Sequence, residues 1–377
     1  MDKVNSDIYR ALAGHLDDLP GGFPSTKSGV ELRILKKLFS PEEARLACCL
    51  TLIPEGPHVI AGRFRQSTGE TAKKLETMAR NGLIMETGTG YMALQFVVGI
   101  WEYQVENLDP ELVADMEEYI PTLFNAEDWR KAPQMRTIPV NRSIDHKLEV
   151  LPHEKAEALI RDKKHFVIGP CICRKERTIA GKGCDKPLEA CISFGDDESY
   201  FVKNNIGRRA SRKEVLDLLA LADRKGLVLQ PSNAKNITWI CCCCGCCCGV
   251  LRTLKFYPDP ASLTANPFAV VLDASGCNGC GICLTRCQME AFSFSGEKVM
   301  LDEKRCIGCG LCVSTCPTDA LKLVRLPGYL QPRVPRNLAT AVLRLAWKRK
   351  KIGPLRFGKM FLKSQRDRML AGLNRNS

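Results

Sequence analysis

Twenty-one cysteines are the residues of this 377-residue chain whose type and spacing suit a specific chemistry. Nineteen of them lie between Cys171 and Cys316, and eight of these form two runs, "CNGCGICLTRC" at 277–287 and "CIGCGLCVSTC" at 306–316. Each run has the spacing C-x2-C-x2-C-x3-C, which turns three thiolates towards one cube of iron and sulfide and sends the fourth to another cube. The runs therefore predict two [4Fe-4S] clusters.

The same spacing assigns the ligands, because the fourth cysteine of each run serves the cluster of the other run. We expect this fourth cysteine to begin a short helix, and small strands to follow in "MEAFSF" and "TDALKLV". The first run departs from the usual pattern in carrying Gln288 where proline follows the second run. Two zinc sites are the alternative. One predicted set is Cys277, Cys280, Cys283 and Cys316, and the other is Cys306, Cys309, Cys312 and Cys287.

Over about residues 273–324 the chain resembles the two-cluster bacterial ferredoxins through these two runs. The resemblance implies electron transfer at low potential, and it implies no particular partner.

A second concentration of thiols, "WICCCCGCCCGVL" at 239–251, holds seven cysteines within eight residues. Neighbouring cysteines seldom reach the geometry of an unstrained disulfide, and thiols this dense in a reducing compartment are more often metal ligands. Consecutive side chains point in different directions, so one cluster cannot easily use all seven. Alternate cysteines either bind one cluster while the others face a second, or some remain free. Four more cysteines lie upstream in "GPCICRKERTIAGKGCDKPLEACISFG".

We predict a third iron–sulfur cluster where these two cysteine groups meet, with a structural zinc or uncoordinated buried thiols as alternatives. The motifs "GPCICR", "ACISFG" and "CCGCCCG" ahead of the ferredoxin runs resemble a group of predicted bacterial and archaeal 4Fe-4S ferredoxin proteins over about residues 151–324. They are more loosely similar to the CCG domains of heterodisulfide reductases. The candidate ligands are Cys171, Cys173, Cys184 and Cys191 with some of Cys241, Cys243, Cys244, Cys246 and Cys247.

The segments around these cysteines predict a small cysteine-rich α/β domain at 137–270, ahead of a two-cluster ferredoxin-like domain at 271–324. "LPHEKAEALIRDKKHFVIG" predicts a helix that leads into a strand, and "MRTIPVNRSI" an extended lead-in. A capping box at Ser211 and Glu214 opens a second helix, which ends before the strand "LVLQ". We expect the loops of this domain to bring the two cysteine groups together.

Residues 27–97 predict three helices and a two-stranded wing, and so resemble a winged helix–turn–helix. Capping boxes at Ser40 and Ser67 open two of the helices, and "LIMETGTGYMAL" predicts a hairpin that turns at Gly88. Cys48 and Cys49 are expected in the core, on the helix "PEEARLACCLTLI". The wing tip has no Lys or Arg to meet a phosphate, so we expect protein docking rather than DNA binding.

The remaining segments, an N-terminal segment at 1–26, a linker at 98–136 and a tail at 325–377, differ most in charge. The linker is acidic and predicts a helix on the surface or against a partner. The tail has fourteen Lys/Arg and one Asp, and its helix-like pieces suit an anionic membrane surface, an acidic protein or the chain's own body. The start lacks a signal-peptide pattern and no apolar run reaches about 18 residues. We expect a cytoplasmic protein, with peripheral contact at the inner face of the membrane as one role of the tail.

Together these patterns predict a multidomain α+β iron–sulfur electron-transfer protein with a basic helical tail. Single electrons would pass through the two ferredoxin-type clusters to or from the third, cysteine-rich metal site. Redox partner proteins would exchange them, since the sequence has no nucleotide-binding or flavin motif. The alternatives are a reductase whose middle-domain cluster acts on a small molecule, and a redox-responsive regulator that uses the winged helix.

Overall fold

The computed structural model describes residues 2–125, 129–130, 132–194, 198–351 and 354–373. It mixes helices with small sheets, as predicted for an α+β protein. The chain divides into two compact units, of which one takes residues 1–123, 199–206 and 342–377, and the other takes 124–198 and 207–341. Parts of the predicted linker (126–128 and 131), middle domain (195–197) and tail (352–353 and 374–377) lie outside the described residues.

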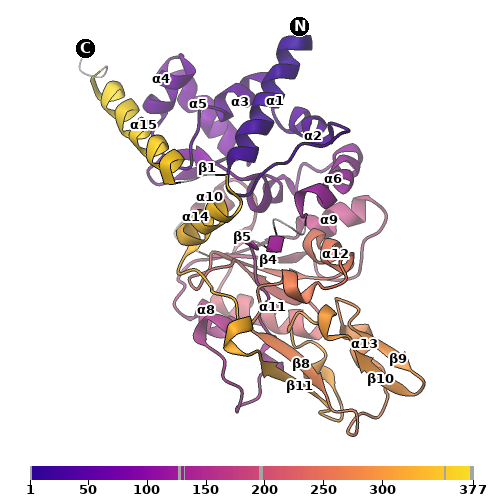
Figure 1. Ribbon diagram of the computed structural model, residues 1–377. Coiled ribbons are helices and arrows are strands. Elements are labelled where there is room, and N and C mark those ends of the chain that lie inside the picture. Colours follow the sequence, from indigo (N-terminus) through magenta and orange to yellow (C-terminus); the bar gives the residue numbers. More distant parts are fainter. Residues whose placement is uncertain (1, 126–128, 131, 195–197, 352–353, 374–377) are drawn as a thin grey trace. The chain divides into compact units, whose positions relative to one another are not determined.

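The first unit is helical apart from one hairpin (Figure 1). At Ser40 the predicted capping box is present, because its side chain accepts the Glu43 N–H while the Glu43 carboxylate accepts the Ser40 N–H. The predicted hairpin is also present, with Thr87 opposite Gly90; its classification as the wing of a winged helix stays a prediction. The elements are α1 (Asp2–Asp18), α2 (Val30–Leu38), α3 (Pro41–Ala47), α4 (Pro57–Phe64), α5 (Thr68–Arg80), β1 (Ile84–Thr87), β2 (Gly90–Ala93), α6 (Pro110–Leu123), α10 (Glu198–Lys203), α14 (Leu338–Lys348) and α15 (Pro354–Leu373).

The helix expected to carry Cys48 and Cys49 is shorter than predicted. α3 ends at Ala47, and both cysteines follow it, partly buried rather than fully in the core. Arg63 of α4 donates to the Cys49 carbonyl oxygen at 3.1 Å, which satisfies a carbonyl that the end of the helix leaves open. Burial raises the pKa of Cys48 to about 11, so this thiol stays protonated at neutral pH.

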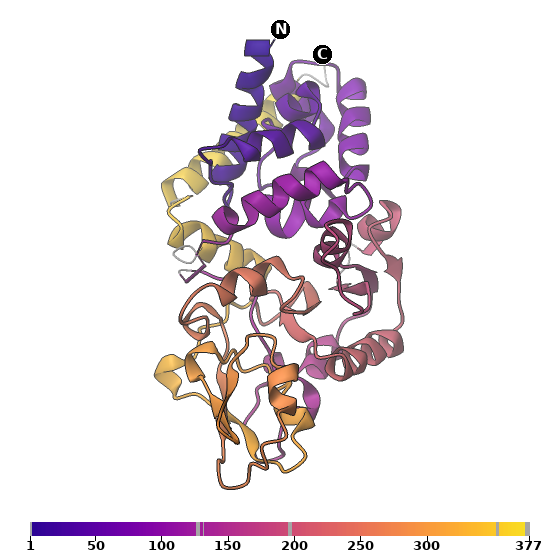
Figure 2. The same ribbon diagram turned by 90° about the vertical axis from the view of Figure 1, so that its right-hand side faces the viewer.

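The acidic segment is paired within its own unit. α6 runs along α2 (Figure 2) and buries an apolar face that includes Met116 and Tyr119. On its polar side, Asp115 and Glu118 bind Arg33 of α2 at 2.9 and 2.8 Å. Part of the linker's negative charge is therefore matched by α2, and contact of the remainder with a partner stays a prediction.

The basic tail also makes contacts within this unit (Figure 1). Asp367 of α15 binds Arg63 of α4 at 2.7 Å, and Arg63 binds the buried Glu55 at 2.6 Å. Ser364 donates to the same Glu55 at 2.6 Å. One tail helix thus packs on the body of the protein, while Trp347 of α14 remains 69 % exposed. A membrane or protein contact of the tail stays a prediction.

The second unit contains a five-stranded antiparallel sheet in the order β5-β3-β4-β7-β6. Ser211 opens α11 with the predicted capping box, and "LVLQ" lies in and just before β6, as expected. The seven-cysteine stretch supplies β7 and the turn after it. The elements of this part are α8 (Ala156–Arg161), β3 (Phe166–Pro170), α9 (Ile172–Ile179), β4 (Glu189–Phe194), β5 (Arg208–Arg209), α11 (Arg212–Arg224), β6 (Val228–Pro231), β7 (Trp239–Cys243) and α12 (Gly249–Lys255).

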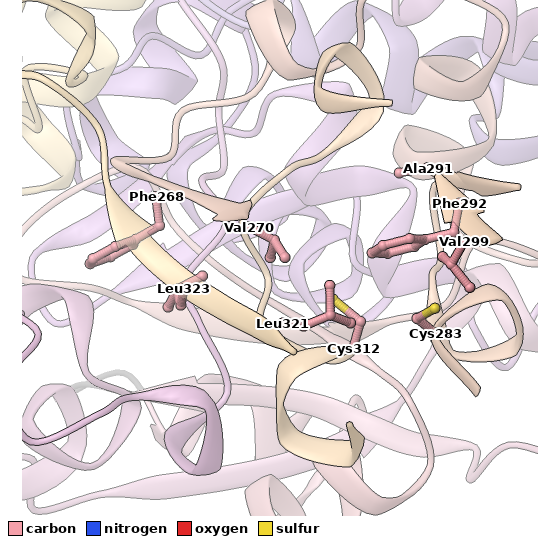
Figure 3. Close-up of a cluster of buried hydrophobic side chains, with 9 residues drawn as sticks. All are labelled: Phe268, Val270, Cys283, Ala291, Phe292, Val299, Cys312, Leu321 and Leu323. Carbon is pink, nitrogen blue, oxygen red and sulfur yellow. The ribbon is translucent and has the colours of Figure 1, made fainter. Parts of the chain in front are cut away.

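Two antiparallel strand pairs complete this unit and enclose a small core. In Figure 3 the side chain of Cys312 lies beside Leu321 and that of Cys283 lies near Val299, so both belong to the cluster of apolar residues from the two pairs. The strands predicted after each cysteine run are present as β9 and β11. The expected helix position is wrong, because α13 ends at Arg286 and Cys287 follows it. The elements are β8 (Phe268–Leu272), α13 (Ile282–Arg286), β9 (Phe292–Ser295), β10 (Lys298–Leu301) and β11 (Leu321–Arg325).

Candidate metal centres

The first predicted ferredoxin set surrounds one cavity. The cavity has about 310 Å³ of empty space including its open side, and apolar side chains such as Leu272 and Val299 form much of its wall. Burial by itself would raise the pKa of Cys316. The pKa is lowered instead, because the backbone N–H groups of Thr318, Leu321 and Ala320 bond to its sulfur. The four thiols that line the cavity are those of Cys277, Cys280, Cys283 and Cys316.

The second predicted set gathers around Cys287. Its sulfur accepts the Ala291 N–H at 3.3 Å. Burial raises the pKa of Cys309 to about 12 and also raises the pKa of Cys312. The charges of the other thiols in the set add to this effect. Thiols this close and this buried gain from a metal, because metal binding replaces their protons. The set comprises Cys287, Cys306, Cys309 and Cys312.

A third, more compact group lies at the turn after β7. Its four sulfurs all lie within 4.8 Å of one another, and the Cys247 sulfur is 3.5 Å from that of Cys184. Hydrogen bonds from Cys247 and the charge of Arg174 lower the pKa of Cys244 to about 4 despite its burial. Four thiolates bound at ~2.3 Å to one tetrahedral ion would lie roughly 3.8 Å apart, so the group fits a single ion. Its members are Cys184, Cys244, Cys246 and Cys247.

The other cysteines predicted for the third site form a separate group. The structure therefore divides the nine candidate ligands between the compact group and this separate group. Cys248 also belongs to the separate group, because its thiol contacts both Cys173 and Cys243. Cys248 belongs to the seven-cysteine stretch, but the sequence offers no signal that separates it from its neighbours. The group comprises Cys171, Cys173, Cys191, Cys241, Cys243 and Cys248.

Arg174 of α9 lies next to both of these thiol groups. It is 3 % exposed and donates to the carbonyl oxygens of Pro187, at 2.8 Å, and Cys242, at 2.6 Å. Burial by itself would lower the pKa of Arg174, but the thiols of Cys171 and Cys244 raise it above its usual value. The guanidinium therefore supplies positive charge where thiolates collect. Nothing in the sequence distinguishes this arginine from its neighbours.

The compact group touches the second ferredoxin set through Gln288, the residue that replaces the usual proline. The Gly245 N–H donates to the side-chain oxygen of Gln288 at 2.8 Å. A Cβ at Gly245 would lie less than 3.0 Å from the Gln288 carbonyl oxygen, closer than Cβ contacts occur in proteins. Only glycine therefore allows the Cys244–Cys247 turn to lie against the residue that follows Cys287.

Residues 269–323 match the family model of the 4Fe-4S dicluster domain. The match covers the ferredoxin part of the chain, and no curated protein matches the chain. The cysteine sets described above fit such clusters, since they consist of thiols in apolar surroundings with backbone N–H groups bonded to sulfur. The match and the cysteine groups support an iron–sulfur electron-transfer role. Each described helix is too short or too polar to cross a membrane.

Proposed function

We propose that this protein transfers single electrons through its two ferredoxin-type sites to or from the compact Cys184–Cys247 site. The dicluster match at 269–323 supports the first two sites, and the four close sulfurs support the third. The contact between Gln288 and Gly245 carries the proposal, because it joins the residue after Cys287 to the turn that holds Cys244 and Cys246.

In this proposal each ferredoxin set of four cysteines holds one [4Fe-4S] cluster, which when bound supplies one-electron reduction and oxidation at low potential. The chain's own residues keep the two sites close together. Cys283 of one set and Cys312 of the other are both buried in the same apolar core. N–H bonds such as that from Ala291 to Cys287 stabilise negative charge on sulfur and so favour the reduced state.

Buried polar contacts hold the ferredoxin part against the sheet that carries β7. Arg286, at the end of α13, binds the buried Asp223 of α11 at 3.1 Å. Ser314 donates to the same carboxylate at 2.8 Å. Arg305 donates to the carbonyl oxygen of Lys255, at the end of α12, at 3.3 Å. These contacts fix the separation between the second ferredoxin set and the compact site, on which electron-transfer rates depend.

The identity of the metal at the compact site decides whether the relay reaches it. Iron held by four thiolates changes its oxidation state, whereas zinc has no redox chemistry and would only stabilise the fold. We propose iron, because Gly245, between Cys244 and Cys246, bonds to Gln288, the residue next to Cys287 of the second ferredoxin set.

Metal analysis of anaerobically purified protein, with a Cys246→Ala variant beside the native chain, tests the proposal. We expect the variant to lose iron from the compact site and to keep the ferredoxin-type signals on reduction with dithionite. In the native protein, rapid-freeze electron paramagnetic resonance should show the compact site changing state after the ferredoxin sites. Zinc in place of iron at this site, or no change there on reduction, would contradict the relay.

The exposure of Cys246 favours one further candidate function. Cys184 is partly buried and Cys244 and Cys247 are buried, whereas Cys246 is exposed. A small molecule can therefore reach one side of the site, as a reductase requires. If the protein is a reductase, small disulfides should perturb the spectrum of the compact site and be consumed under dithionite. Unchanged spectra would contradict the reductase function and leave electron transfer as the remaining candidate.

A further inference from the structure

The cysteine-rich part of the chain has more thiols than the compact site uses. We propose that the six-thiol group of Cys171, Cys173, Cys191, Cys241, Cys243 and Cys248 binds a polynuclear iron–sulfur cluster of its own, separate from the compact site. This inference goes beyond the proposed relay and holds whether the compact site carries iron or zinc.

Strand geometry puts half of this group on one face of the sheet. Side chains alternate along a strand, so Cys241 and Cys243 of β7 share a face while Cys242 points to the other. Cys191 of β4 is paired with Cys241 in the register of the two strands and shares its face. Cys242 is 1 % exposed, and burial raises its pKa to about 12. Alternation alone therefore separates Cys242 from the group.

The other three thiols reach this face from the segments that follow strands. Cys171 comes directly after β3 and Cys173 lies in the first turn of α9. Cys248 immediately precedes α12, and its sulfur accepts the N–H groups of Val250 and Leu251. Backbone donors of this kind are what a metal-bound thiolate needs around it.

The six thiols form a continuous series of contacts. Cys173 contacts Cys171 and Cys248, Cys243 contacts Cys248 and Cys241, and Cys241 contacts Cys191. Each inner thiol thus lies between two others. The S–H group is a weak donor, so these contacts alone are a poor reason to bury so many sulfurs together. We assign the inner four as ligands, with Cys171 and Cys191 at the two ends of the series; the inner four are Cys173, Cys241, Cys243 and Cys248.

The shape of the group favours a cluster over a single ion. Among the described residues, the compact arrangement that one ion needs occurs at Cys184 and its three partners. The six-thiol group instead extends along the sheet face from α9 to β4. In a [4Fe-4S] cube each cysteine binds a different iron, at a different corner. The four cysteine sulfurs therefore lie further apart than four sulfurs that bind one ion. Arg174, beside Cys171 and Cys243, adds positive charge that offsets the negative charge of a thiolate-bound cluster.

A matched pair of variants in one strand tests this inference. Cys243→Ala removes an inner ligand, and Cys242→Ala changes the same residue type at the next position, on the opposite face. Acid-labile sulfide separates cubes from single ions, since only clusters contain it. We expect about twelve sulfides per native chain, from three cubes. Cys243→Ala should lower the sulfide content by about one third, and Cys242→Ala should leave it unchanged.

Two further variants keep the outcomes distinct. If Cys243→Ala fails to fold, Cys173→Ala should show the same loss of sulfide. Retention of about eight sulfides in that variant would show that the ferredoxin part is intact. Cys246→Ala should remove metal from the compact site and no sulfide. The inference is overturned if the native chain holds only about eight sulfides. It is equally overturned if Cys246→Ala removes the extra four, or if Cys243→Ala removes only one zinc.

Discussion

Replacing Gly245 by alanine should strain the junction between the seven-cysteine turn and the ferredoxin part. The added Cβ would lie within 3.0 Å of the Gln288 carbonyl oxygen and 3.1 Å from its carbonyl carbon. Both are backbone atoms, so a rotamer change cannot relieve the clash, and one segment must shift by roughly 1 Å. The shift would also break the 2.8 Å hydrogen bond from the Gly245 N–H to the Gln288 side chain.

The two effects can be summed for an expected magnitude. Overpacking costs about 1–3 kcal/mol, and the lost hydrogen bond costs about 1 kcal/mol. We therefore expect Gly245→Ala to destabilise the second unit by about 2–4 kcal/mol. For a unit of this size, that corresponds to a fall in melting temperature of roughly 5–15 °C. Circular dichroism of the anaerobic, metal-loaded protein measures it, and hydrogen exchange at position 245 reports the junction directly.

Two control variants separate the clash from unrelated effects of mutation. Gly328→Ala lies in the same unit and meets no atom within 4 Å, so it should change the melting temperature by less than about 2 °C. Gln288→Ala removes the acceptor without adding a Cβ at Gly245, and should cost about 1 kcal/mol. If Gly245→Ala melts within about 2 °C of the native protein and keeps its exchange protection, Gly245 does not lie against Gln288.

Three further predictions concern charge and metal. Arg174→Met removes a buried cation that bonds two carbonyl oxygens. We expect it to lower the free energy of unfolding by about 2–4 kcal/mol in a melting experiment and to make the reduction potential of the neighbouring centre more negative in a redox titration. A potential equal to the native one would contradict the assigned charge effect. Arg63→Ala leaves the buried Glu55 carboxylate without its guanidinium partner and should destabilise the first unit by about 3–5 kcal/mol, as measured by chemical denaturation; Arg80→Ala, at an exposed ion pair with Glu76, should cost less than 1 kcal/mol as the control. Removing iron with a chelator should unfold residues around 268–325, whose core includes Cys283 and Cys312, while the helices of the first unit persist; full retention of the β-strand signal and of protease resistance would contradict it.

Local patterns in the sequence were enough for several elements. The capping boxes at Ser40 and Ser211 mark real helix starts, because a side chain that accepts its N3 amide acts within one turn. The hairpin over β1 and β2 follows from short alternating segments around a turn. The eight-cysteine spacing predicted a dicluster domain, and the family match at 269–323 supports it. The end of α3 was not predicted, and the carbonyl oxygen of Cys49, which follows it, is bonded by Arg63, 14 residues further along the chain.

Residue type and close spacing were enough to indicate that this chain collects thiols for iron–sulfur chemistry, because both are read directly from the order of the residues. How the eleven thiols between 171 and 248 are divided into groups became clear only from the fold. Cys184 is far in sequence from Cys247 yet lies 3.5 Å from it, and Cys191 pairs with Cys241. Strand register and alternation set these partners, and both depend on which strands neighbour one another. The meaning of Gln288 likewise emerged only with Gly245 against it, since a close approach of two backbones leaves no local signal in either segment.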